Sequence, residues 1–287
     1  MKLLSFNSFL TLIKYKVSLA VTFTATTGYL VYTGYFDLQV LNLIVAVFIL
    51  AGGSGALNQF QERKYDLLME RTKFRPIPSR EITPKNALLL SVLLILTGLI
   101  YLYFIFGKVP ALLGLFNIVW YNLLYTNLKR FSPFAVVPGS LVGAIPVLIG
   151  WTAAGGFVFE RTIVFIGFFL FIWQIPHFWL LMMKYGDQYE KAGFPTINQS
   201  FNVAGLRKII FSWVVATSAF SIAIPLFLTE LSWIFFMIVF LLNITFVAVF
   251  ARLSFGKTDV VNLKQSFISI NVYMILFMGL LILYHLS

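Results

Sequence analysis

QVLNLIVAVFILAGGSGALNQFQERKYDLLMERTKFRPIPS, residues 39–79, passes from an apolar half into a strongly polar half. The apolar half, 39–57, has nearly the length of about 20 residues that crosses the hydrocarbon core of a bilayer. The polar half carries four side chains at intervals of four residues: Asn58, Glu62, Asp66 and Glu70. Carboxylates near lipid are costly unless they have partners, and this chain has only ten in 287 residues. The stretch therefore predicts a membrane helix that leads into a functional polar segment.

The rest of the chain repeats the apolar half of this pattern. Hydrophobic residues make up 60% of the sequence and the mean hydropathy is +0.91, which excludes an ordinary soluble domain. The runs are continuous and do not alternate, which favours helices over a β-barrel. We predict an all-α integral membrane protein with a single domain, 1–287. Its nine transmembrane helices are expected near 13–34, 39–57, 86–106, 109–128, 134–154, 161–183, 207–228, 231–252 and 264–286.

The charges predict the orientation of these spans. With the N-terminus in the cytoplasm, all but two of the 21 Lys and Arg residues, Lys108 and Arg161, fall on the inner side. The net charge of +11 is then mainly topological, and no nucleic-acid partner is expected. The absence of cysteine excludes disulfides and thiolate metal sites. These features fit a multi-pass protein of the bacterial plasma (inner) membrane, with lipid as its surroundings.

Two long inner connections, 58–85 and 184–206, hold six of the ten carboxylates. If the second span continues as a helix beyond residue 57, Asn58, Glu62 and Asp66 share one face. An amide oxygen and two carboxylates suit Mg²⁺, which takes substrate phosphate and water as further ligands. The alternative is a solvated helix end with i,i+4 ion pairs.

The second loop carries Asp187 and Glu190 between two lysines, and Tyr189 has a hydroxyl for a phosphate. An ordinary polar loop is the alternative. Two such loops on one face favour a bridged metal–diphosphate site, and a diphosphate substrate found in membranes is a prenyl diphosphate. The side chains predicted to bind the diphosphate are Arg71, Arg75, Lys184, Lys191 and Tyr189.

Three blocks of sequence resemble the UbiA superfamily of intramembrane prenyltransferases and, within it, the haem O synthase subfamily. They are NQFQERKYDLLMERTKFRPIPS (58–79), YTNLKRFSPFAVVPGSLVGAIPVLIGW (125–151) and WQIPHFWLLMMKYGDQYEKAGFPTI (173–197). The resemblance spans nearly the whole chain. The middle block matters most for choosing the subfamily, and PHFW and DxYxxAGxP in the third block point to the same one.

The resemblance implies a nine-helix bundle around a central cavity. It also implies transfer of a farnesyl group from farnesyl diphosphate to the 2-vinyl group of haem b, with addition of water and with Mg²⁺ as cofactor. By the family pattern, the catalytic and metal-binding residues are Asn58, Glu62, Asp66 and Asp187. The chain departs from the pattern at Glu62, where Asp is frequent, and at Lys191, where the wider superfamily has a second Asp.

Candidate haem-binding residues are His177, Lys129 and Arg130. His177 in PHFW suits haem iron or a propionate, or else a satisfied polar position in a helix core. Lys129 and Arg130 suit the propionates, or else anchor the topology.

Two other functions stay open at the level of sequence. One is a prenyltransferase of the same superfamily that acts on an aromatic quinone precursor or chlorophyllide. The other is a transporter, which is disfavoured because no Asp or Glu falls at the centre of a predicted span. A downstream haem-using enzyme is a further partner to consider.

Overall fold

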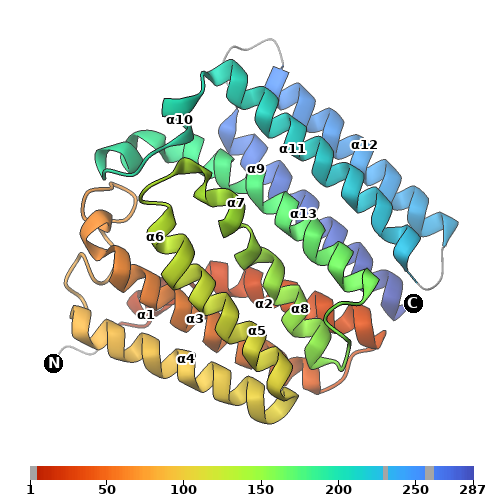
Figure 1. Ribbon diagram of the computed structural model, residues 1–287, viewed down its shortest axis with the longest axis horizontal. Coiled ribbons are helices and arrows are strands. Elements are labelled where there is room, and N and C mark those ends of the chain that lie inside the picture. The colour runs from red at the N-terminus through yellow and green to blue at the C-terminus, as the bar shows by residue number, and fades with distance from the viewer. Residues whose placement is uncertain (1–4, 229–231, 256–261) are drawn as a thin grey trace.

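The computed structural model describes residues 5–228, 232–255 and 262–287, and every regular element in these ranges is a helix (Figure 1). Four charged residues used in the sequence argument lie outside the described ranges: Lys2, Glu230, Lys257 and Asp259.

Most of the helices follow one another with short connections, and the segment 67–83 between α3 and α4 is the long exception among the described residues. In chain order they are α1 (Phe6–Leu12), α2 (Tyr15–Thr33), α3 (Gln39–Asp66), α4 (Pro84–Phe106), α5 (Lys108–Ile118), the π-helix η1 (Val119–Tyr125), α6 (Thr126–Leu128), the 3₁₀-helix η2 (Pro133–Ala135), α7 (Val136–Gly139), α8 (Leu141–Ala153), α9 (Arg161–Lys191), α10 (Ile197–Ser200), α11 (Val203–Ala223), the 3₁₀-helix η3 (Ile224–Phe227), α12 (Trp233–Phe255) and α13 (Leu263–Leu286).

Eight helical stretches in the described ranges are long and apolar enough to cross a membrane. They match eight of the nine predicted spans. The remaining one, α2, is a 19-residue helix at the predicted place but is not among the eight. Its sequence contains five threonines and Lys16, which lower its apolar character.

Two helices continue beyond their predicted ends, into what the sequence analysis treated as loops. α3 extends from the apolar run to Asp66, and α9 extends to Lys191. Loss of hydropathy marks where a span leaves lipid, but it does not end a helix whose residues still favour helical structure. The expectation that the second span continues as a helix beyond residue 57, with Asn58, Glu62 and Asp66 on one face, is thereby confirmed.

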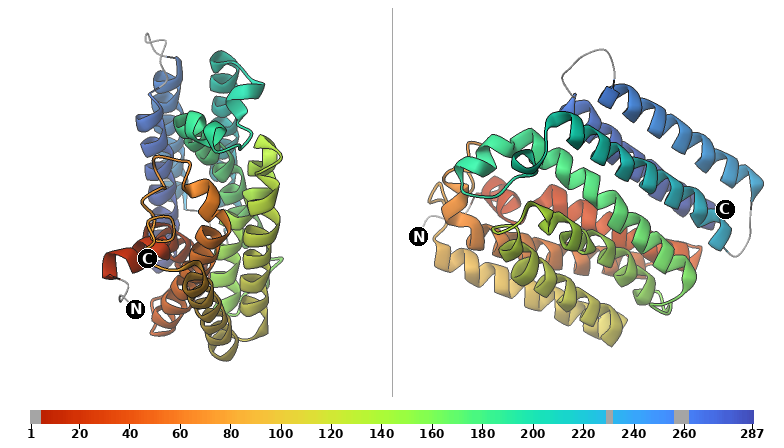
Figure 2. Two further views of the ribbon diagram at one scale, coloured as in Figure 1. Left: turned by 90° about the vertical axis from the view of Figure 1, so that its left-hand side faces the viewer. Right: turned by 45° about the horizontal axis from the view of Figure 1, so that its top comes forward.

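The interior consists of two large apolar clusters that follow the order of the chain. One joins α2–α5 with α8, and the other joins α8 and α9 with α11–α13. The right-hand view of Figure 2 shows α11–α13 on one side of the bundle and α3–α5 on the other. The two halves meet where α2 packs on α8 and α13.

Glycines permit the closest of these crossings. A Cβ atom on Gly28 would lie 2.0 Å from the carbonyl oxygen of Val147, and one on Gly150 would lie 1.7 Å from that of Ala25. Small residues allow helix backbones to approach in this way in a membrane. Gly150 therefore has a packing role at the crossing of α2 and α8.

Gly150→Ala should lower stability by about 1–3 kcal/mol, because the added methyl group overpacks the α2–α8 crossing. Gly279→Ala is the matched control, since a Cβ there meets nothing within 4 Å. Thermal unfolding of both variants in the same detergent checks this. A Gly150→Ala protein as stable as the Gly279→Ala protein would contradict it.

Candidate metal and anion site

A cavity of about 660 Å³ lies within the bundle, between residues of α2, α3, α5, η1, α8, α9 and α13. Its two parts differ in chemistry. One end is lined by two carboxylates, Glu62 and Asp66, and by four basic side chains: Lys14, Arg71, Arg75 and Lys129. Lys16 also belongs to the cavity lining. The rest is mainly apolar, with residues such as Val47, Ile118 and Met274. An anionic head and an apolar tail would both find a matching surface here.

The polar end is built on the last turns of α3. Asn58, Glu62 and Asp66 all line the cavity and are buried, with 1%, 6% and 0% of their surface exposed. Glu70 lies apart from them: its side chain is exposed and pairs with Lys73 at 2.5 Å. The structure thus brings together the first three residues of the four-residue repeat and excludes the fourth.

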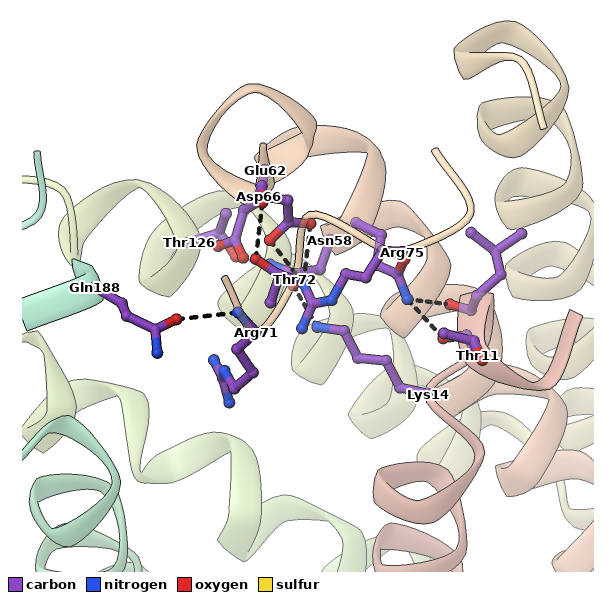
Figure 3. A network of polar contacts seen from close by, with 12 residues as sticks. Thr11, Lys14, Asn58, Glu62, Asp66, Arg71, Thr72, Arg75, Thr126 and Gln188 are labelled. Atoms are coloured by element: carbon purple, nitrogen blue, oxygen red, sulfur yellow. Dashed lines mark hydrogen bonds and ion pairs between the residues drawn. The ribbon is translucent and has the colours of Figure 1, made fainter. Parts of the chain in front are cut away.

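Each of these three side chains contacts a basic side chain. Figure 3 shows two of these bases, Lys14 and Arg75, close to the end of α3. Arg75 donates from Nη1 to both carboxylate oxygens of Asp66, at 2.9 Å each. Lys129 forms an ion pair with Glu62. Lys14 donates from Nζ to Oδ1 of Asn58 at 2.5 Å. The bases come from three separate segments of the chain, so the tertiary fold creates the pairing.

The two lysines respond oppositely to this environment. Burial and the nearby charge of Arg75 lower the pKa of Lys14 to about 7, against a smaller opposing effect of Glu62. Burial also disfavours the charged form of Lys129, but the Glu62 carboxylate beside it outweighs this effect and raises the pKa of Lys129 above its ordinary value. Lys129 is therefore fixed as a cation at neutral pH.

Lys14 was missed as a site residue, because a lysine at the start of a span has the same sequence signal whether it faces headgroups or a cavity. Its backbone has φ 49° and ψ 49°, an uncommon left-handed conformation for a side chain of this kind. Gln59 stabilises the turn by donating to the carbonyl oxygens of Thr11 and Leu12 at 2.7 and 3.0 Å. The neighbour of Asn58 on α3 thus holds the turn that directs Lys14 at Asn58.

A π-helix provides the aromatic wall beside these charges. In η1 the rings of Tyr121 and Tyr125 stack with centroids 6.0 Å apart, and Tyr125 stacks on Phe178 of α9 at 5.9 Å. All three line the cavity. π-helical turns are rare and often occur at functional sites. Stacked aromatic faces can stabilise a cation through their quadrupoles.

Buried amides fix η1 and α6 against α3. Ser54 donates to Oδ1 of Asn122 at 2.7 Å, and Nδ2 of Asn122 donates to the Ser54 carbonyl oxygen at 3.1 Å. Asn58 uses its own Nδ2 to donate to Thr126 Oγ1 at 3.0 Å. The sequence analysis did not identify Asn122 or Thr126, since single polar residues in an apolar run carry no partner information.

The two acidic segments do meet, but through side chains other than the carboxylates. The backbone N–H of Arg71 donates to Gln188 Oε1 at 3.0 Å, and its guanidinium donates to the Tyr189 hydroxyl at 3.1 Å. Arg71 and Tyr189 line the cavity. The helix α9 departs from helical geometry at Tyr185, just before this contact.

The other predicted residues of the second segment lie elsewhere. Asp187, Lys184 and Lys191 are exposed and lie outside the cavity lining. Glu190 receives a hydrogen bond from Thr196. Their expected roles stay predictions.

The three candidate haem residues occupy different places. His177 lines the cavity between the rings of Trp173 and Phe267, each with its centroid 4.9 Å away, and its Nδ1 is buried without a hydrogen-bond partner among the described residues. Lys129 lies among the α3 carboxylates. Arg130 is outside the lining and stacks over Tyr65 at 5.1 Å.

The donor set at the polar end fits Mg²⁺ with a phosphorylated ligand better than a metal held by protein alone. Across the described ranges, no three His, Cys, Asp or Glu side chains are close enough together to hold a metal ion. Two buried carboxylates and an amide oxygen are hard ligands, and Mg²⁺ characteristically takes one or two carboxylates and completes its shell with substrate phosphate and water.

The fold and the cavity together define a multi-pass helical membrane protein with an internal binding site. Comparison with known sequences identifies its family. The pattern of the UbiA prenyltransferase family matches residues 20–281, and the chain belongs to that family.

Three similar proteins bear the same name. The protoheme IX farnesyltransferase of Flavobacterium psychrophilum is 34% identical over 265 residues, which cover 88% of this chain and 86% of that protein. The protein of the same name from Christiangramia forsetii is 32% identical and covers 92% and 89%. That from Geobacter sulfurreducens is 40% identical over a shorter part, 64% of this chain and 68% of its own.

Solved structures support the fold. A digeranylgeranylglyceryl phosphate synthase matches with a TM-score of 0.78 over 98% of both chains, at 17% identity. A UbiA homologue from Archaeoglobus fulgidus bound to GPP and Mg²⁺ matches with a TM-score of 0.71 over 98% of this chain and 99% of that one, at 15% identity.

Asn122→Ala should destabilise the protein by about 1–3 kcal/mol, because it leaves buried polar groups of Ser54 without partners. The control is Asn127→Ala, whose exposed side chain only donates to the Leu123 carbonyl oxygen, and which should change stability by less than about 0.5 kcal/mol. Thermal unfolding in detergent compares the two. Equal stability of both variants would contradict the proposed clamp between α3 and η1.

Proposed function

We propose that this protein transfers a farnesyl group from farnesyl diphosphate to the 2-vinyl group of haem b, with addition of water, and so forms haem O. The observation that carries the proposal is the two-part cavity: carboxylates and an excess of bases at one end, and a long apolar wall beyond them. Two relatives, matched over 86% and 89% of their own length, bear the name protoheme IX farnesyltransferase.

At the polar end, Asn58, Glu62 and Asp66 would hold Mg²⁺ together with the diphosphate. The metal, when bound, supplies charge neutralisation for the departing diphosphate. Arg71, Arg75 and Tyr189 would bind its oxygens, and their position in the cavity lining supports this. Lys129 belongs with this group in our proposal, because it forms an ion pair with Glu62.

The apolar wall would hold the farnesyl chain and keep water from its first carbon. Loss of diphosphate leaves an allylic cation, and the stacked faces of Tyr121, Tyr125 and Phe178 lie between the charged end and the remainder of the cavity wall. Exclusion of water at this point matters because a free cation would otherwise be hydrolysed before the acceptor reacts.

His177 is the residue we propose for haem. Its ring is part of the cavity lining among aromatic side chains suited to a flat macrocycle, and an imidazole nitrogen is a common ligand of haem iron. Arg130, outside the lining, is proposed only for a propionate that extends beyond the cavity.

Three finer features complete the proposal. Asp187 would bind a second metal or the diphosphate after its segment turns toward the cavity, with Lys184 and Lys191 beside it. We propose α2 as a ninth span and a cytoplasmic N-terminus, as the distribution of Lys and Arg favours. The setting would be the bacterial plasma membrane, where a downstream haem-using enzyme takes the product.

The direct test is the mass of haem extracted after incubation of the purified protein with haem b, farnesyl diphosphate and Mg²⁺. The expected product gains one farnesyl group and one hydroxyl group. Parallel incubations replace haem b with hydroxybenzoate or chlorophyllide. Prenylation of either of these and not of haem b would overturn the proposal in favour of another acceptor.

Asp66→Asn should reduce Mg²⁺-dependent turnover about a hundredfold or more, because a buried carboxylate at the polar end is lost. Glu70→Gln, which changes an exposed carboxylate outside the cavity, is the matched control and should keep near-normal turnover. Asp187→Asn should behave like Asp66→Asn if its segment joins the site. Normal turnover of Asp66→Asn would refute the metal–diphosphate assignment.

His177→Ala should weaken haem binding and change the absorption spectrum of bound haem. The control is His285→Ala, since His285 lies near the C-terminus and hydrogen-bonds the Leu281 carbonyl. Titration of haem into both variants, followed by the Soret band, measures the effect. An unchanged affinity and spectrum in His177→Ala would return this residue to a packing role.

A further inference from the structure

The three side chains proposed as metal ligands share one property that the proposed function does not explain. Each is already in contact with a basic side chain: Lys14 with Asn58, Lys129 with Glu62, and Arg75 with Asp66. All three bases line the same cavity as the oxygens they contact. The oxygens suited to a metal and the bases suited to a diphosphate are therefore paired with each other in this structure.

These contacts are not loose surface pairs. The side chain of Asp66 is fully buried and that of Glu62 is 8% exposed, while Arg75 and Lys129 are 20% and 19% exposed. Removal of one partner from a buried ion pair leaves an uncompensated charge, which costs far more than loss of an exposed pair. Whatever separates these pairs must supply replacement partners for both sides.

A divalent cation alone supplies only half of that replacement. It would take the oxygens of Glu62 and Asp66, but it would displace Lys129 and Arg75 into the cavity with no anion to pair with. A diphosphate alone also supplies only half, since it would draw the bases away and leave the carboxylates of Glu62 and Asp66 unpaired. Only the two ligands together provide a counter-charge for every group.

We infer that Lys14, Arg75 and Lys129 exchange partners on binding, from the α3 oxygens to diphosphate oxygens, and that this exchange makes metal and diphosphate bind as a coupled pair. Lys14 takes part in this exchange through its contact with Asn58. The inference rests on the proposed metal–diphosphate site. Coupling of this kind is reciprocal, so each ligand raises the affinity of the other by the same factor.

The exchange has a direct consequence for metal binding without diphosphate. In Lys129→Met, Glu62 loses its competing cation, so Mn²⁺ or Mg²⁺ alone should bind about tenfold or more tightly than to the unmodified protein. The control is Arg71→Met, which removes a positive charge from the same cavity although Arg71 contacts no carboxylate there. Its metal affinity should change by no more than about threefold, the remaining long-range effect of one charge.

The same exchange predicts the opposite result for the anion. In Glu62→Gln, Lys129 is released, so inorganic pyrophosphate in the presence of EDTA should bind about tenfold or more tightly. Since metal and pyrophosphate are never present together in these titrations, their association in solution does not interfere. Asp66→Asn and Arg75→Met form a second pair of variants for the same two measurements.

Isothermal titration of the purified, full-length protein, with gel filtration of each variant, decides the matter. Higher metal affinity in Lys129→Met than in Arg71→Met, together with higher pyrophosphate affinity in Glu62→Gln, supports the exchange. Equal metal affinities in Lys129→Met and Arg71→Met overturn the exchange and leave the proposed function intact. Absence of any binding of Mg²⁺ and pyrophosphate, even when both are added to the unmodified protein, overturns both.

Discussion

The compensation of buried charge at the end of α3 is the constraint on which the rest of this structure depends. A carboxylate taken out of water without a partner is far too costly for a folded state of ordinary stability. Glu62 and Asp66 are both buried, and each is matched by a base that no neighbouring turn of the same helix provides. The fold must therefore bring cations to this one place from elsewhere.

Three elements of the architecture serve that requirement. The turn between α1 and α2 delivers Lys14, the segment after α3 folds back to deliver Arg75, and the end of α6 delivers Lys129. Hydrogen bonds hold such a segment in place. Gln59, for example, donates two hydrogen bonds to the turn between α1 and α2. Tight glycine crossings between α2 and α8 bring together two of the helices that line the cavity. The apolar packing of the bundle therefore also positions the charged side chains of the site.

The sequence predicted the helical class, eight of the spans and the polar face of α3, because hydropathy and a four-residue spacing are local signals. It did not predict that α9 stays helical to Lys191, since the fall in hydropathy there marks the membrane surface and not the end of a helix. It also failed to find Lys14 and Asn122. Their importance arises from contacts with residues 44 and 68 positions away, and a single sequence carries no record of such pairs.

The imbalance of charge at the polar end has a chemical meaning of its own. Four basic side chains (Lys14, Arg71, Arg75 and Lys129) line the cavity there with two carboxylates, although compensation of those carboxylates needs only two cations. A site designed only to keep itself neutral would have no use for the remainder. A leaving diphosphate, however, gains a further negative charge as its bond to carbon breaks, and groups that favour this later charge lower the barrier more than groups that bind substrate and transition state equally. Arg71 is the clearest example among the described residues, because it lines the cavity, bonds to Tyr189 and Gln188, and contacts neither buried carboxylate. The excess of bases thus favours ionisation of an anionic leaving group over mere retention of a metal.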